Sequence, residues 1–357
     1  MFPVIVLFAV ISSVAAASDD PVLRAADQEV ERAMEVFSSM ERAPYFLGVE
    51  ITETHRVDLV GEYGGLQPYE PSAIRWVDVD VRLGDRNFDS THPLRSASDS
   101  NQKNGRRLVL GDDVTVIQRG IWSEVDRRTR MAYDRWAKVL ADQQTLVQEV
   151  PAPDLVEVAT HEYLADLQMQ PWDDLSLSEW EQTIRSASAV FSGSETVHTG
   201  YARLDARALT RWFVSSEGTR IRTQTQYLRA SVNASTTAED GTQLSLSQAW
   251  SARNPAALPG KEEILAAAAS LEMDLANLVA APEQEPFKGP ALLGGRAAAV
   301  LFHEVFGHRM EGHRLKKVQD AQTFRSMVGE PILPEFLSVF DDAPQASLGE
   351  TELNGHY

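Results

Sequence analysis

The chain has 357 residues, of which 43% are hydrophobic, so it is long enough for two domains with buried cores. Asp and Glu number 52 against 33 Lys and Arg, which gives a formal net charge of −19. Nucleic-acid partners are therefore not expected, because binding to phosphates depends on basic patches. The sequence contains no cysteine, so disulfide bonds cannot stabilise it.

Residues 1–17 have features of a secretory signal peptide. An apolar run from Phe2 to Val10 is followed by Ala15-Ala16-Ala17, which supplies a small-residue cleavage site. The run is short for a membrane span and lacks a basic segment before it, and a buried N-terminal strand or helix is the alternative. We expect an exported protein, periplasmic or extracellular, with no stable membrane span after cleavage of the signal.

Hydrophobic periodicity predicts several helices and antiparallel strands after the signal. Spacing of three and four residues indicates helices, and alternation of apolar and polar residues indicates strands. The dipeptide Glu217-Gly218 lies between two alternating segments and predicts a hairpin turn. The predicted helices are Val22–Met40, Gly120–Gln148, Ser176–Phe191 and Lys261–Ala281, and the predicted strand segments are Tyr45–Val60, Ile74–Val81, Thr196–Arg207 and Arg211–Trp250.

These elements predict an α+β fold, because the strands do not alternate with helices as βαβ units do. Residues 18–281 are expected to form an N-terminal α+β domain, with helices packed on an antiparallel sheet. Pro282 ends the last predicted helix, and a linker-like segment leads into residues 282–357.

The segment AVLFHEVFGHRMEGHR, from Ala299 to Arg314, contains His303-Glu304-x-x-x-His308. In the related pattern HExxH the two histidines lie about 40° apart on a helix and reach one metal ion. One more residue raises the separation to about 140°. The segment must therefore bulge, end its helix or bind the ion with a distorted turn, and Gly307 is the residue expected to permit this. The apolar residues Leu292–Phe302 are expected to form a buried helix that holds the ligands rigidly.

His303 and His308 are candidate zinc ligands, and Glu304 is a candidate general base. Imidazole and carboxylate groups suit zinc, and catalytic zinc keeps three protein ligands and a water. A carboxylate beside a ligand can take a proton from the attacking water and return it to the leaving amine. A chance histidine-rich helix is the alternative that spacing alone leaves open.

The motif segment strongly resembles the TldD/PmbA family of metallopeptidases, also known as modulators of DNA gyrase. Active members carry HExxxH followed closely by a triplet such as Leu-Glu-Gly, and here that triplet is Met310-Glu311-Gly312. The clear resemblance covers about Phe287 to Tyr357. Segments on both sides of the motif also match, at Phe287–Leu293, Gly329–Ile332 and Val339–Asp342.

The resemblance implies that His303 and His308 bind Zn²⁺ and that Glu304 is the catalytic acid/base. The family's third protein ligand is a cysteine in a β-rich C-terminal domain, whereas this sequence has none. His313, Glu311 and His356 are the candidates for a replacement. Residues 282–357 are accordingly expected to be the start of that metal-binding domain, an incomplete C-terminal metallopeptidase domain.

The expected function is zinc-dependent hydrolysis of peptide bonds in small or unfolded peptides, which would bind as an extra strand along a sheet edge. Because the family works as dimers, a homodimer or a heterodimer with a related subunit is expected. The alternative is a catalytically incomplete binding or partner subunit. Of the remaining histidines, His55, His92 and His198 are expected to be structural, and His161 to have a surface or capping role.

Overall fold

The computed structural model describes residues 20–94, 105–143, 153–167, 175–312, 314, 324–340, 342, 345, 347–348 and 351–352. The predicted signal peptide and the candidate ligands His313 and His356 lie outside these residues. None of the described helices is both long enough and apolar enough to cross a bilayer.

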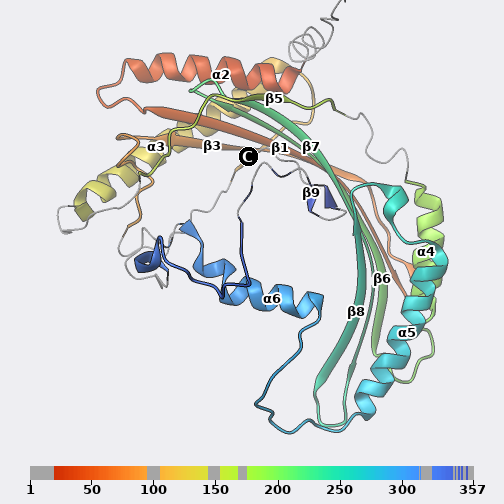
Figure 1. Cartoon of the computed structure of the whole chain (residues 1–357). Helices are drawn as coiled ribbons and strands as arrows, with labels where there is room; N and C mark the ends of the chain where they lie inside the picture. The colour runs from red at the N-terminus through yellow and green to blue at the C-terminus, as the bar shows by residue number, and fades with distance from the viewer. Residues whose placement is uncertain are drawn as a thin grey trace, which may run out of the picture.

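An eight-stranded, curved sheet forms the frame of the chain (Figure 1). The strand order is β4-β3-β1-β6-β7-β5, with β2 paired to β1 and β8 paired to β7. All pairs are antiparallel except β5 with β7, which is parallel. The strands are β1 Phe46–Glu62, β2 Gly65–Leu66, β3 Ser72–Arg82, β4 Arg106–Leu108, β5 Glu162–Leu164, β6 Thr199–Ser215, β7 Arg220–Thr237 and β8 Gln243–Ala252.

Two long hairpins make up most of this sheet. The turn predicted at Glu217-Gly218 joins β6 to β7, and Gly218 has the positive φ of 88° that such a turn needs. The Gly218 N–H donates to the Ser215 carbonyl at 3.0 Å and closes the turn. The other hairpin pairs β1 with β3, as the alternation of both segments predicts.

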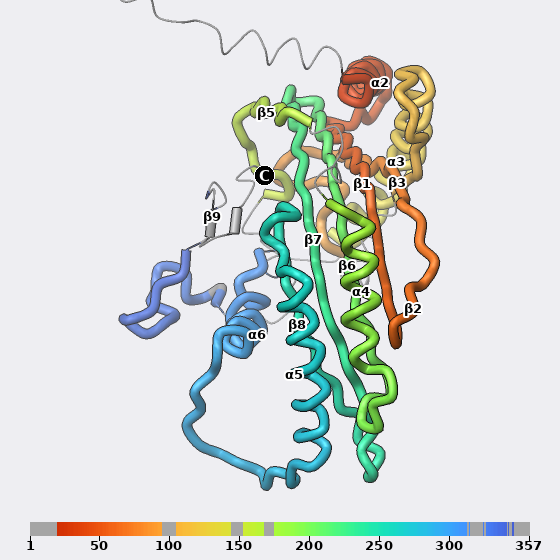
Figure 2. The backbone as a smooth tube through the Cα atoms, turned by 90° about the vertical axis from the view of Figure 1, so that its right-hand side faces the viewer, coloured from red at the N-terminus to blue at the C-terminus, as the bar shows by residue number. Residues whose placement is uncertain are grey.

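Four helices cover one face of the sheet, and the views in Figures 1 and 2 agree on this. One core lies beneath the first two helices and includes Leu47, Ile51 and Val77. A second core lies beneath the other two and includes Leu59, Leu204 and Val232. The helices are α2 Pro21–Ser38, α3 Val114–Gln143, α4 Leu177–Ala189 and α5 Lys261–Ala280. The predicted α+β fold, with helices packed on an antiparallel sheet, is thus confirmed.

The segment after α5 contains α6, Gly295–Val305, on the concave side of the sheet, which α2 to α5 leave uncovered (Figure 1). Every residue from 281 to 305 is exposed. Strand pairing among the described residues of this segment is limited to the short pair β9 Ser347–Leu348 and β10 Thr351–Glu352.

Candidate metal site

The helix that carries the first histidine ends before the second one is reached. His303 and Glu304 lie in the last turn of α6, whereas His308 lies in the 3₁₀ turn Gly307–Arg309. Phe306 joins the two with φ −115° and ψ −54°, away from ideal helical values. The chain therefore accommodates the extra residue between the histidines by ending α6 before His308, rather than by a bulge or a distorted turn within the helix.

The 3₁₀ turn brings His308 back over the end of α6. The N–H groups of Arg309 and Met310 donate to the carbonyls of Phe306 and Gly307, each at 3.0 Å, so each turn closes over three residues. The rings of His303 and His308 consequently lie with their centroids 4.4 Å apart, at an interplanar angle of 64°. On a continued α-helix, residues five apart would diverge by about 140°.

Gly307 does not supply the special backbone conformation that the sequence led us to expect. Its φ is not positive, unlike that of Gly329 in the same segment. A Cβ at position 307 would lie 3.8 Å from Nδ1 of His303, an ordinary van der Waals contact. The prediction that Gly307 permits the distortion through an unusual backbone conformation is wrong, because the distortion is taken up at the end of the helix.

The three residues singled out from the sequence gather at one point. One nitrogen from each of His303 and His308 and one oxygen from Glu304 all lie within 4.8 Å of one another. The Glu304 carboxylate lies between the histidines, with Oε1 4.0 Å from Nε2 of His303 and Oε2 3.9 Å from Nε2 of His308. The side chains have relative exposures of 63%, 62% and 42% for His303, Glu304 and His308.

Glu311 contacts the second histidine from the side away from Glu304. Its Oε1 lies 2.8 Å from Nδ1 of His308, and its Oε2 accepts a hydrogen bond from Nε of Arg314 at 2.9 Å. The hydrogen bond with His308, together with the weaker effect of Arg314, lowers the pKa of the Glu311 carboxyl below its usual value, although burial acts the other way. Since this carboxylate holds Nδ1, the other nitrogen of His308 remains available to a metal. Sequence spacing pointed to Glu311 only as a third ligand, and the pairs 308/311 and 311/314, three residues apart, were the signal for this role.

The donor set has the chemistry of a zinc site. Two imidazoles are ligands that Zn²⁺ accepts, at distances of roughly 2.0–2.1 Å, and tetrahedral coordination would place their ligand atoms about 3.3 Å apart. The two histidine nitrogens and the Glu304 oxygen lie within 4.8 Å of one another, so the histidines need only a small movement and the carboxylate is near enough to act on a metal-bound water. All three side chains are at the end of an exposed helix, where rotation about side-chain bonds is open to them. The residues present therefore fit the ion as two of its ligands and a base.

The predicted burial of the helix that carries the site is wrong. Val300, Leu301 and Val305 have relative exposures of 57%, 51% and 53%. Apolar spacing identifies the face of a helix that can be buried, but burial itself requires an element to pack against. Among residues 281–312, Phe306 is the one that is buried, and its ring lies 4.9 Å from that of Phe302 and 5.9 Å from that of Phe324.

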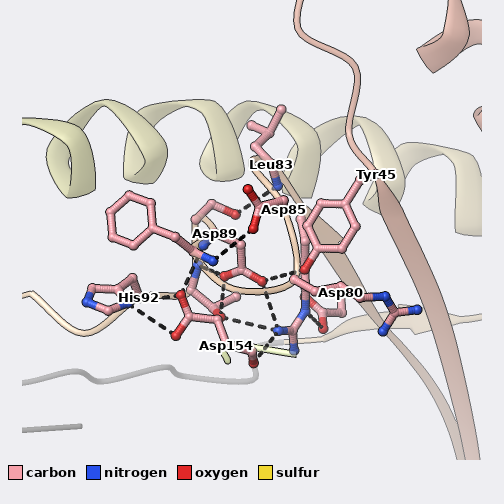
Figure 3. A network of polar contacts seen from close by, with 12 residues as sticks. Tyr45, Asp80, Leu83, Asp85, Asp89, His92 and Asp154 are labelled. Carbon is pink, nitrogen blue, oxygen red and sulfur yellow. Dashed lines mark hydrogen bonds and ion pairs between the residues drawn. The ribbon is translucent and has the colours of Figure 1, made fainter. Parts of the chain in front are cut away.

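The histidines outside the motif lie far from it in the sequence, and each contacts residues of its own surroundings. His92 lies in a polar network with Asp154, whose Oδ2 is 2.9 Å from Nδ1 of the ring (Figure 3). In the same network, the fully buried carboxylate of Asp89 accepts hydrogen bonds from Tyr45 and Arg82 at 2.7 and 3.1 Å. These contacts support the structural role predicted for His92.

The remaining histidines lie on strands or at strand ends. Nε2 of His55 lies 2.7 Å from Glu53 on the same strand, and Nδ1 of His198 accepts the N–H of Thr237 at 3.2 Å. His161 is exposed and its carbonyl accepts the N–H of Arg220. Among the described residues, the motif segment contains the one cluster of three groups placed to hold a metal.

Comparison with solved structures finds partial matches, among them gyrase-modulator and TldE proteins. A candidate modulator of a DNA gyrase from Thermotoga maritima has 14% identity and a TM-score of 0.40, with 69% of this chain and 47% of that chain covered. TldE from Thermococcus kodakarensis has 8% identity and a TM-score of 0.39, with coverages of 69% and 46%. A candidate modulator of DNA gyrase from Bacteroides thetaiotaomicron has 11% identity and a TM-score of 0.37, with coverages of 71% and 49%.

The chain thus spans about half the length of the structures that it matches. These structures bear the names of the family that the motif segment resembles. No family model matches the sequence, and no curated protein matches it significantly.

Proposed function

We propose that this chain carries the metal centre of a zinc-dependent peptidase of the TldD/PmbA type. The observation that supports the proposal is the meeting of His303, Glu304 and His308 at the end of α6, with ligand atoms within 4.8 Å of one another. Zinc, when bound there, would polarise the scissile carbonyl and activate the attacking water.

The chain's own residues would divide the work between holding the ion and moving a proton. His303 and His308 would hold it through ring nitrogens, and Glu311 would fix the orientation of the His308 ring through Nδ1. Glu304, whose oxygens lie 3.9 and 4.0 Å from the two Nε2 atoms, is near enough to take a proton from the attacking water. Glu304 then returns this proton to the leaving amine.

The substrates that we propose are small or unfolded peptides, bound as an extra strand. β8 pairs with β7 alone among the described strands, so its outer edge offers backbone groups to an extended peptide. We also propose export of the chain and assembly as a homodimer or with a related subunit. Gel filtration with light scattering would test the assembly, and a periplasmic or culture-medium assay of the tagged full chain would test the export.

The experiment that tests the function compares metal content and peptide hydrolysis in one set of variants. We expect about one zinc per full chain and peptidase activity that a chelator abolishes. His303→Ala and His308→Ala should lose both, whereas His161→Ala, which removes an exposed histidine elsewhere, should keep both. Glu304→Gln should keep the zinc and lose the activity.

Two other outcomes would change the assignment. Loss of zinc in Glu304→Gln would make Glu304 a ligand rather than the base. A folded wild-type chain that binds no zinc and hydrolyses no peptide would refute the enzyme, and would favour a catalytically incomplete partner subunit. That second candidate draws its support from the solvent exposure of the His303, Glu304 and His308 side chains, which is 63%, 62% and 42%.

A further inference from the structure

The concave face of the sheet carries a group of arginines that the proposed peptidase chemistry does not use. Side chains alternate between the two faces of a strand. Val57 and Leu59 of β1 point into the core beneath α4 and α5, so Arg56 and Asp58 point to the other face. The same alternation places Arg203, Asp205 and Arg207 of β6, and Arg229 of β7, on the uncovered side. Figure 1 shows that α6 lies on this side as well.

These residues, here named the arginine cluster, are Arg56, Asp58, Arg203, Asp205, Arg207 and Arg229. Asp205 accepts paired hydrogen bonds from Arg56 at 3.1 and 3.0 Å and from Arg207 at 2.9 and 2.5 Å. Asp58 accepts two bonds of 2.7 Å from Arg203 and one of 2.9 Å from Arg56. Two carboxylates therefore hold three guanidinium groups in fixed orientations.

The register of the strands places like charges directly opposite one another. Arg56 faces Arg207 across the β1–β6 pair, and Asp58 faces Asp205. Directly opposed like charges destabilise a sheet, and here diagonal ion pairs offset that cost. Burial raises the pKa of Asp205, but hydrogen bonds from Arg207 and Arg56 outweigh it and leave this pKa below the ordinary value. Stability alone would favour alternating charges across the pair, so the stacked arginines call for another explanation.

The cluster keeps donors that can bind a further anion. The side chains of Arg56, Arg203 and Arg207 have relative exposures of 34%, 37% and 46%. Among the described residues, the Nη1 groups of these three have no acceptor. Arg229 is exposed and has no carboxylate partner in the described part of the chain. Four guanidinium groups against two carboxylates leave the cluster at +2, in a chain whose net charge is −19.

Arg211 extends the donors along the same face of β6. It forms an ion pair with Glu50 at 2.6 Å, and its buried Nε has no hydrogen-bond partner among the described groups. The positively charged donors on this face of the sheet are thus arginines rather than lysines. Guanidinium groups bind carboxylates through two parallel hydrogen bonds, which a lysine ammonium cannot do.

We propose that the arginine cluster binds an extended acidic peptide across the concave face. An extended peptide with alternating carboxylates presents them all on one side, matching arginines that lie on alternate positions of neighbouring strands. The binding goes beyond the proposed peptidase activity and does not depend on the candidate metal site. Its location on the side of α6 would give peptides rich in Asp and Glu priority as substrates.

The test measures binding of a labelled peptide to the full chain by fluorescence anisotropy, with chelator present so that no metal contributes. The probe is a fluorescein-labelled peptide of about twelve residues with Glu at alternate positions, and the matched peptide has Gln in place of each Glu. At low salt we expect the Glu peptide to bind at least about tenfold more tightly than the Gln peptide. The difference should shrink as salt screens exposed charges.

Two arginine variants and one control locate the binding. Arg229→Gln leaves every ion pair of the cluster intact and should weaken binding of the Glu peptide about threefold to fivefold. Adding Arg207→Gln should bring the loss to about tenfold or more. Arg130→Gln removes an exposed arginine from α3, on the covered face, and should leave binding unchanged. Circular dichroism confirms that each variant is folded.

Equal binding of the Glu and Gln peptides, or no binding of either, would overturn the proposal. An effect of Arg130→Gln as large as that of Arg229→Gln would also overturn it, because binding would then follow total charge. The binding assay depends on neither zinc content nor peptidase activity. Its result can therefore be interpreted even if the chain binds no zinc.

Discussion

Glu311→Gln is the most informative single change near the candidate metal site. The carboxylate lies 2.8 Å from Nδ1 of His308 and accepts from Arg314 at 2.9 Å, so it joins the histidine to a cation. Glutamine keeps the shape of the side chain but removes its charge. If Glu311 orients His308, the variant should bind zinc more weakly without losing the site.

The expected size of the effect follows from one charge-assisted hydrogen bond in a partly exposed setting. Groups that orient metal ligands typically change metal affinity by about tenfold to a hundredfold when they are removed. Here the side chains of His308 and Glu311 are 42% and 35% exposed, so solvent screens the interaction. We therefore expect about a tenfold loss of zinc affinity, at the low end of that range.

The assay is competition for zinc with a chromophoric chelator at neutral pH, on the full chain. Glu335→Gln, an exposed glutamate in the same segment, is the matched control and should bind zinc as the wild type does. An unchanged affinity in Glu311→Gln would refute the orienting role. A loss as complete as that of His308→Ala would show instead that Glu311 is itself a ligand.

Three further substitutions test the structural reasoning. Gly307→Ala should keep wild-type zinc affinity in the same competition assay, because a Cβ there would stand 3.8 Å from its nearest neighbour, and a large loss would contradict the backbone geometry. Gly84→Ala should lower the free energy of unfolding in urea by about 1–3 kcal/mol or more, because Gly84 has a φ of 105° and its Cβ would lie 2.4 Å from the Phe88 carbonyl oxygen; an unchanged midpoint would count against this. Asp205→Asn should cost stability at pH 7 and progressively less below pH 3.8, the ordinary pKa of this carboxyl. Since the folded pKa is depressed, the stabilisation is present above the unfolded pKa and disappears as pH falls through the folded one. Urea midpoints at pH 7 and pH 3 that differ equally from those of the wild type would refute that linkage.

The elements of the fold could be predicted from the sequence because their signals are local. The helix predicted at Lys261–Ala281 is found at Lys261–Ala280, and the turn at Glu217-Gly218 lies where the sequence places it. The helix predicted at Gly120–Gln148 starts too late in the chain, since α3 begins at Val114. The apolar positions fixed the type of each element, whereas its ends depend on neighbouring backbone groups.

The grouping of His303, Glu304 and His308 was also predictable, since the three residues lie within six consecutive positions. Two aspects were not, because each depends on contacts outside the motif. Apolar spacing predicted burial of α6, but the described part of the chain packs no element against its exposed valines and leucines. The arginine cluster unites Arg56, Arg203 and Arg229, which lie far apart in the sequence and meet only through the registers of β1, β6 and β7.

The helix end gives the two histidines different kinds of support, and this difference makes the role of Glu311 testable. His303 is held by the backbone of α6, whose hydrogen bonds continue as far as the Phe306 N–H, which donates to the Phe302 carbonyl at 2.9 Å. His308 follows the helix end and lies in a single 3₁₀ turn, which is a weaker backbone constraint. The side-chain link through Glu311 to Arg314 supplies the orientation that an HExxH helix would have supplied by its own geometry. In this chain Glu311, three residues after His308, thus adds a side-chain constraint where the backbone constraint is weaker.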